Sequence, residues 1–132
     1  NWRAGEHCTL EAALLTHADL SQACLQHCDL SGADLRGATL SAALLQHCNL
    51  SATHGAQLVA QNAYFSDCNL SNAQWPEANL LDSRLRKVCL ERVDLRSSNL
   101  HGLRSEGSNS KEIYLEHALM TRCNLREDLA SG

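Results

Sequence analysis

Large apolar side chains occupy almost every fifth position of this chain, and this period constrains the fold more than any other feature. Counted in fives from residue 10 to residue 125, 20 of 24 positions carry Leu, Phe, Trp or Met. The four exceptions are Gly55, Ala60, Ser105 and Ser110. A period of five fits neither an α-helical turn of 3.6 residues nor the alternation of a β-strand. A short repeat of constant length instead predicts a solenoid of stacked, equivalent turns.

A second column stands two residues before the first and carries mostly small residues, such as Ala13 and Cys28. Many repeats place an Asp or Asn between the two columns, as at Asp19 and Asn49. One large and one small inward side chain per five residues suits a narrow, closely packed interior. Asx side chains favour tight bends because they hydrogen-bond to nearby backbone groups.

These units resemble a known repeat. The clearest examples are Ala18-Asp19-Leu20-Ser21, Ala33-Asp34-Leu35-Arg36 and Ala78-Asn79-Leu80. They are similar to the A(D/N)LXX unit of the pentapeptide-repeat family, and the resemblance covers about residues 6 to 127. It implies an all-β fold, a right-handed quadrilateral parallel β-helix with one repeat on each side and four repeats in each coil. The chain is long enough for about six coils.

Four sides of five residues would make residues twenty apart vertical neighbours. The segments 6–10, 26–30, 46–50 and 66–70 are alike and recur at this spacing. Gly55 is then expected directly under Trp75, and Leu58 and Leu103 are expected to replace the volume missing at Ala60 and Ser105. The predicted core ladder comprises Leu10, Leu30, Leu50, Leu70, Leu90, Cys8, Cys28, Cys48, Cys68 and Trp75.

The chain is predicted to be a single β-helix domain over residues 1–132. Residues 1–5 lie outside the repeat and are expected to cap the first coil, with Trp2 as a lid, and 126–132 form a C-terminal tail. Residues 101–112, rich in Gly, Ser and Asn, are either a degraded coil or a protruding loop. The tail offers little cover for the last coil, so a homodimer through the C-terminal end is one hypothesis.

Composition limits the compartment. No run of 18 apolar residues exists, and no leader resembles a signal peptide. The seven cysteines are expected to be reduced structural thiols, because stacked side chains at the coil spacing stand wider apart than the roughly 3.8 Å between disulfide β-carbons. A reducing, cytoplasmic location is therefore expected. The chain begins at Asn1 without Met, so a fragment of a larger protein remains an alternative.

Catalytic, cofactor and metal sites are not indicated. The chain contains no Gly-rich phosphate loop, G-x-S-x-G or H-E-x-x-H motif, and no C-x-x-C pair. His7, His27 and His47 are expected to form an outward ladder that is simply solvated. A filled rod also has no interior space for a substrate. We therefore expect a protein that is not an enzyme and needs no cofactor.

The charge distribution separates the remaining function classes. Residues 1–60 carry two arginines against five carboxylates, whereas residues 84–104 carry six basic residues against two acidic ones. The candidate partner surface comprises Leu44, Tyr64, Arg84, Arg86, Lys87, Arg92, Arg96 and Arg104. Apolar residues at outward positions, such as Leu44 and Tyr64, are typical either of wall packing or of a contact surface.

Three hypotheses follow. The first is a non-catalytic protein–protein interaction platform. The second draws on the resemblance, since pentapeptide-repeat proteins of the quinolone-resistance type imitate DNA and act on DNA gyrase. The basic belt across the middle of this chain is wrong for imitating phosphates along the full length. Direct nucleic-acid binding by that belt is not favoured, because aromatic residues are not interleaved with it. The third is the repeat module of a bacterial effector or adaptor, which includes secretion.

Overall fold

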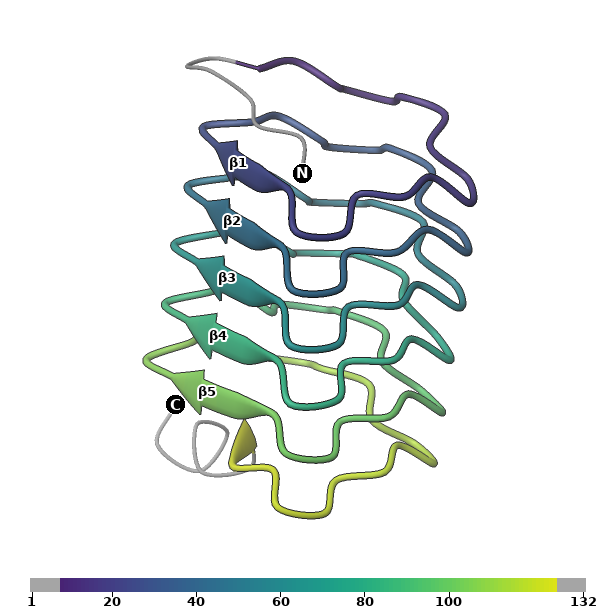
Figure 1. Cartoon of the computed structure of the whole chain (residues 1–132). Coiled ribbons are helices and arrows are strands. Elements are labelled where there is room, and N and C mark those ends of the chain that lie inside the picture. The colour runs from purple at the N-terminus through teal and green to yellow at the C-terminus, as the bar shows by residue number, and fades with distance from the viewer. Residues whose placement is uncertain (1–7, 126–132) are drawn as a thin grey trace.

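The computed structural model describes residues 8–125 as a rod of stacked parallel coils (Figure 1). One side of the rod carries five short strands: β1 (Cys24–Gln26), β2 (Leu44–Gln46), β3 (Tyr64–Ser66), β4 (Arg84–Arg86) and β5 (Arg104–Glu106). They form one parallel sheet in chain order. Each residue is paired with the residue twenty positions later, as Leu45 is with Phe65. The predicted all-β parallel solenoid is confirmed.

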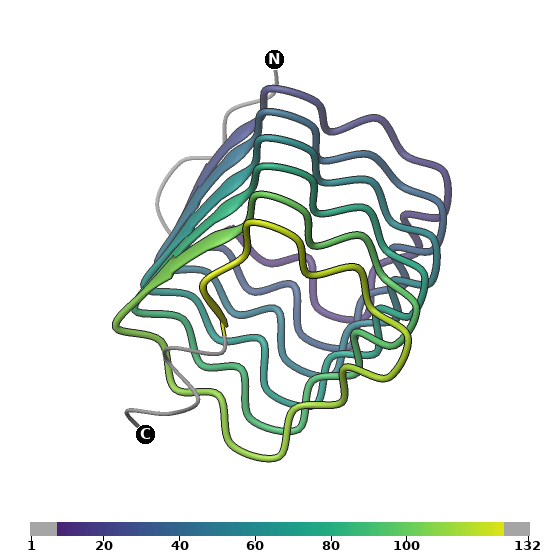
Figure 2. The same ribbon diagram turned by 90° about the horizontal axis from the view of Figure 1, so that it is seen from below.

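The other three sides keep the same spacing without forming longer strands. Isolated parallel bridges join residues twenty apart, from Thr9 with Asp29 to Asn99 with Leu119. Viewed along the rod, the coils superpose with a four-sided outline (Figure 2). The strand ladder delimits four complete turns between Cys24 and Arg104. The sequence predicted about six coils, whereas the ladder defines four; residues 8–23 and 105–125 extend the rod beyond these four turns at its two ends.

The corners of each coil recur every five residues at the second position after each inward large residue. The φ angle is positive at nineteen non-glycine positions of this kind, with His17 (59°) as an example, and at four glycines. At most corners an N–H donates back across the turn, as Ala13 N does to the Leu10 carbonyl at 3.0 Å. Asx side chains support these bends, since Asp29 Oδ1 accepts from Ser31 N at 2.9 Å. The predicted role of Asx residues is confirmed.

The interior is filled by the two inward columns. Trp75 is fully buried, and a β-carbon placed on Gly55 would stand 2.5 Å from its Cδ1 atom. The predicted stacking of Trp75 on Gly55 is therefore confirmed. The indole nitrogen donates to Thr53 Oγ1 at 2.9 Å, which satisfies the one polar atom of the ring. The Trp75 ring also packs against the Phe65 ring, with the two ring centroids 5.9 Å apart.

Most of the predicted core ladder is buried. Leu30, Leu50, Leu70, Leu90, Cys28, Cys48 and Cys68 are at most 3% exposed. Cys8 and Leu10, in the first described coil, are half-buried. Leu58 and Leu103 are also completely buried beside Ala60 and Ser105. The exchange of large and small positions within a repeat therefore preserves the core volume.

Residues 101–112 follow the coil. Arg104 pairs with Arg84 in the sheet, and Asn109 bridges Cys89. Gly102 and Gly107 take the positive φ that every corner needs, with φ of 73° and 66°. The small and polar composition that raised the alternative of a protruding loop is thus accommodated inside a regular coil.

The edge of β5 is partly covered by a side chain. The Asn124 carboxamide accepts from Ser105 N at 2.6 Å and donates to Ser105 O at 3.1 Å, and so imitates a neighbouring strand. The expected cap at 1–5 and tail at 126–132 lie outside the described residues. Within residues 8–125, no helix is long and apolar enough to span a bilayer.

Candidate binding surface

Because the interior is packed, the side chains available for function lie on the outer walls. We call the outward side chains of β1 to β5 the β wall. Its first column is Cys24, Leu44, Tyr64, Arg84 and Arg104, and its second is Gln26, Gln46, Ser66, Arg86 and Glu106. The first column changes from half-buried apolar residues to exposed arginines. This wall therefore joins an apolar strip to a positive end.

Two arginines at the positive end form no ion pair with any described residue. Arg84 and Arg104 are direct neighbours in the sheet register, and neighbouring strands lie about 4.8 Å apart. Among the described residues, no carboxylate lies within 4.0 Å of either guanidinium group. The Arg84 guanidinium carbon instead lies 5.0 Å from the centroid of the Tyr64 ring. Like charges directly opposite each other repel, so this arginine pair would gain from a bound anion.

The other arginines of the predicted surface are already engaged. Arg96 makes two hydrogen bonds to the Asp94 carboxylate, at 2.8 and 2.9 Å. Arg92 binds Glu91 at 2.8 Å and also donates to Asn72 Oδ1. Both belong to a different side of the rod, outside the β wall. The predicted partner surface is thus divided between two sides, and only part of it carries free positive charge.

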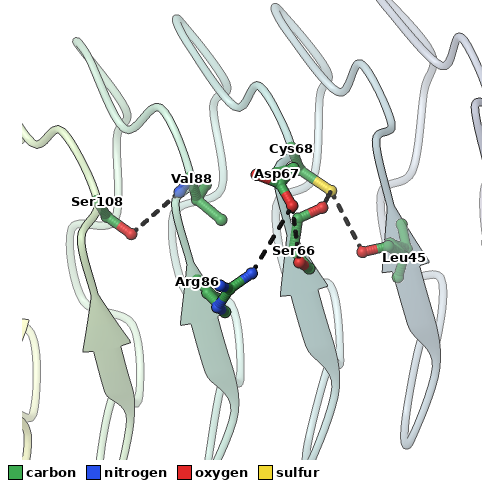
Figure 3. A network of polar contacts seen from close by, with 7 residues as sticks. All are labelled: Leu45, Ser66, Asp67, Cys68, Arg86, Val88 and Ser108. Atoms are coloured by element: carbon green, nitrogen blue, oxygen red, sulfur yellow. Dashed lines mark hydrogen bonds and ion pairs between the residues drawn. The ribbon is translucent and has the colours of Figure 1, made fainter.

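Arg86 belongs to a mixed polar network (Figure 3). Its Nη1 atom lies 4.0 Å from Asp67 Oδ2, which also accepts from Ser66 Oγ at 3.1 Å. Lys87 follows at the corner and is exposed, with no ion pair among residues 8–125. The second column of the β wall is therefore closer to neutral than the first.

A shallow hollow lies over the positive end of the β wall, with a volume of about 260 Å³. It is lined by Tyr64, Arg84, Leu85, Arg86, Arg104, Ser105, Glu106 and Asn124. Ligand pockets usually enclose roughly 300–1,000 Å³. The hollow therefore fits a protruding side chain of a partner better than an enclosed small molecule.

Several outward carboxylates are tied to the coil itself. The side-chain hydrogen bond from Arg36 lowers the pKa of Asp34 to about 2. The corresponding bond from Arg96 lowers the pKa of Asp94. In both pairs the arginine follows the aspartate by two residues, and its backbone N–H also binds the carboxylate. These walls consequently present less free negative charge than the sequence suggests.

All seven cysteines are free thiols. Burial raises the pKa of Cys28 to about 12. A hydrogen bond with Cys48, together with burial, raises the pKa of Cys68. Because the apolar core surrounds both sulfur atoms, burial favours neutral thiols at Cys48 and Cys68. Cys68 Sγ also lies 3.4 Å from the Leu45 carbonyl oxygen. Cys28, Cys48 and Cys68 therefore act as core packing groups.

Two of the three residues of the predicted histidine ladder lie within the described part of the chain. The His27 and His47 rings are stacked, with centroids 4.9 Å apart and planes 4° apart. His7 lies outside the described residues. Among residues 8–125, no group of three or more His, Cys, Asp or Glu side chains is arranged to hold a metal ion.

The sequence indicated a basic belt over residues 84–104. It did not show which of the arginines in that belt are paired with carboxylates and which are not. The signal for that division is the spacing of charges: Arg36 and Arg96 stand two residues after Asp34 and Asp94, where their side chains can reach the carboxylates. Arg104 has Gly102 at that spacing, and Asp82, two residues before Arg84, lies at a corner with positive φ instead of between the two inward columns. Counting charge by segment alone obscures this difference.

The family model described as "Pentapeptide repeats" matches in eight copies, over residues 6–32, 13–51, 33–57 and 63–102. Comparison with curated proteins gives no match. Among solved structures, the chain is similar to HetL, a pentapeptide repeat protein involved in heterocyst differentiation regulation from the cyanobacterium Nostoc sp. strain PCC 7120. That similarity has 24% identity and a TM-score of 0.46 and covers 86% of this chain and 64% of HetL.

It is also similar to a trypsin-treated variant of QnrB1, a plasmid-mediated fluoroquinolone resistance protein. Here the identity is 20%, the TM-score is 0.45, and the coverage is 83% of this chain and 61% of the other. Rfr23 from the cyanobacterium Cyanothece 51142 shares 28% identity, with a TM-score of 0.35 and coverage of 77% and 63%. The chain therefore spans less than two thirds of the length of each of these proteins.

Proposed function

This chain belongs to the pentapeptide-repeat family, and from that premise we propose that it is a non-catalytic platform whose outer wall binds another protein. The observation that carries the proposal is the β wall, where Leu44 and Tyr64 lead along one column to Arg84 and Arg104. Side chains fixed on a rigid solenoid lose little conformational entropy when they bind. The packed core supports a role for the surface rather than for an internal site.

Site-specific photo-cross-linking tests this proposal. A photoreactive phenylalanine analogue replaces Tyr64 on the β wall and, in a matched control, exposed Gln74 on another side of the rod. Irradiation in a lysate of the native cells is expected to give a discrete adduct from position 64 and none from position 74. Adducts of equal yield at both positions would indicate non-specific contact, and the absence of any adduct at position 64 would contradict the platform.

A topoisomerase-directed, DNA-imitating role is the alternative. It would need negative charge spread along the rod. The Asp34 carboxylate is held by Arg36 at 2.6 Å, and the arginine pair presents positive charge on the β wall. We therefore rank this alternative second. A gyrase supercoiling assay with and without a fluoroquinolone separates the two functions, since only the alternative expects an effect of the added protein.

We also propose a cellular compartment for this protein and consider a role as one module of a larger protein. Seven free thiols, three of them buried in the core, support a reducing compartment such as the cytoplasm. The role of a repeat module within a larger bacterial effector or adaptor is compatible with the same binding wall. Comparison of the purified protein's mass with that of the protein in its native cells tests this role.

A further inference from the structure

We propose that the arginine pair, Arg84 and Arg104, binds two carboxylates on an acidic segment of the protein partner. A neighbouring apolar side chain of that segment would pack on Tyr64 and Leu44. This inference rests on the proposed function and specifies its chemistry.

The arrangement of the first column supports this ligand. Arg84 and Arg104 are exposed neighbours in the sheet, and among the described residues neither has an ion-pair partner. A carboxylate can accept two hydrogen bonds from one guanidinium group in a fixed planar geometry. The Tyr64 ring holds the Arg84 guanidinium group at 5.0 Å, so this donor is partly ordered before binding.

The spacing suits an extended segment. Neighbouring coils lie about 4.8 Å apart, and alternate residues on one face of an extended chain are roughly 6.6 Å apart. Two flexible arginine side chains can span that difference. A partner segment lying along the rod axis would therefore place two acidic residues, separated by one residue, against the arginine pair. The next residue on the same face of that segment would then contact Tyr64.

Glu106 does not neutralise this site. It lies in the second column of the β wall, opposite Arg86. No ion pair joins Glu106 to any described arginine or lysine. Glu106 and Asp67, which lies near Arg86, place negative charge beside the arginine pair. They therefore limit the size of an anionic ligand that can bind to the β wall.

That limit favours an acidic peptide over a nucleic acid. Duplex DNA carries one charge per roughly 1.7 Å of its axis, and the whole protein carries a net charge of −4. A long polyanion would meet Glu106, Asp67 and the acidic first half of the rod. A peptide with two local carboxylates can contact the arginine pair and avoid them.

Fluorescence anisotropy tests the proposal with a defined probe. The probe is a fluorescein-labelled peptide, Ser-Leu-Ser-Glu-Ser-Glu-Ser, and its control has Gln in place of both Glu residues. The protein variants are Arg84→Gln/Arg104→Gln and a matched pair, Arg92→Gln/Arg96→Gln, which removes the same charge from the other side of the rod. Circular dichroism and thermal unfolding confirm that each variant is folded.

We expect the Glu peptide to bind at least fivefold more weakly to the Arg84/Arg104 variant than to the unchanged protein. The Arg92/Arg96 variant is expected to change the affinity less than twofold, and the Gln peptide to bind far more weakly than the Glu peptide. This discrimination between the two variants and the two peptides supports the proposal.

Three results would overturn it. They are equal binding of the Glu and Gln peptides, equal losses in the two arginine variants, and tighter binding of a deoxythymidine oligonucleotide than of the Glu peptide. If position 64 still cross-links a partner under these results, the platform stands and only the acidic ligand is wrong. If cross-linking also fails, the proposed function is wrong.

Discussion

Replacing Gly55 with alanine tests the packing of successive coils. The added β-carbon would lie 2.5 Å from Trp75 Cδ1, 2.8 Å from Nε1 and 3.0 Å from Cγ, whereas carbon atoms pack best at roughly 3.5–4.0 Å. The ring cannot move aside freely, because it is fully buried and its nitrogen is bonded to Thr53. Forcing an extra methyl group into such a core costs about 1–3 kcal/mol.

A smaller opposing effect must be subtracted. Gly55 does not have a positive φ, so alanine there also reduces the entropy of the unfolded chain, which stabilises by about 0.4–1 kcal/mol. The midpoints of these two ranges differ by about 1 kcal/mol, so we expect Gly55→Ala to lower the free energy of unfolding by roughly that amount. The measurement is equilibrium unfolding in urea, with the midpoint and the slope fitted separately.

The double variant Gly55→Ala/Trp75→Leu provides the control. Trp75→Leu alone leaves a cavity and is expected to cost about 2–4 kcal/mol. With leucine at 75, the new alanine methyl group fills space instead of colliding with the ring. The combined loss should therefore be smaller than the sum of the single losses by about 1–2 kcal/mol. Additivity within about 0.5 kcal/mol would refute direct stacking of the two residues.

Three further predictions follow from individual contacts. Ser83→Ala should stabilise the protein by about 1 kcal/mol, because the buried Ser83 hydroxyl has no hydrogen-bond partner within the described chain. Ser98→Ala should destabilise the protein by about the same amount, because Ser98 Oγ donates a hydrogen bond to the Trp75 carbonyl. If urea unfolding showed that both variants change the stability in the same direction, this prediction would be wrong. In ¹³C NMR titrations the pKa of Asp34 should be about 2 and should rise toward its ordinary value in Arg36→Gln, so the stabilising contribution of this pair is present above pH ~4 and is lost as the pH falls through the folded-state pKa. An unchanged Asp34 pKa in that variant would exclude the arginine as the cause. Arg104→Gln should raise the free energy of unfolding by about 0.2–1 kcal/mol through relief of repulsion from Arg84, and a loss of stability would mean that the arginine pair is already neutralised.

The sequence predicted the fold because the repeat reports it directly. Residues five apart lie on successive sides and residues twenty apart on successive coils, so one column of leucines defines both the corners and the stacking. The match between Gly55 and Trp75 was predictable for the same reason. When the residues that stack on each other are known, an unusually small residue in one coil can be matched with an unusually large one in the next.

The division of the basic belt was harder to predict, because it depends on side-chain direction. Arg96 reaches back to Asp94 two residues away, whereas Arg84 leans toward Tyr64 twenty residues away. Residues 101–112 raised the alternative of a loop for a related reason. Composition alone does not show that Gly102 and Gly107 fall at corners, where glycine is the favoured residue.

The stacking of residues twenty apart underlies every surface assignment, and hydrogen-bond scalar couplings measure it directly. In the isotopically labelled protein, an NMR experiment that detects coupling across N–H···O=C bonds should join amides of the large inward column to carbonyls nineteen residues later. The expected pairs are Leu30 with Asn49 at 2.7 Å, Leu50 with Asn69 at 2.7 Å, Leu70 with Cys89 at 2.8 Å and Leu90 with Asn109 at 2.6 Å. Couplings to carbonyls four residues earlier, or to carbonyls shifted by one pentapeptide, would contradict the coil and with it the β wall.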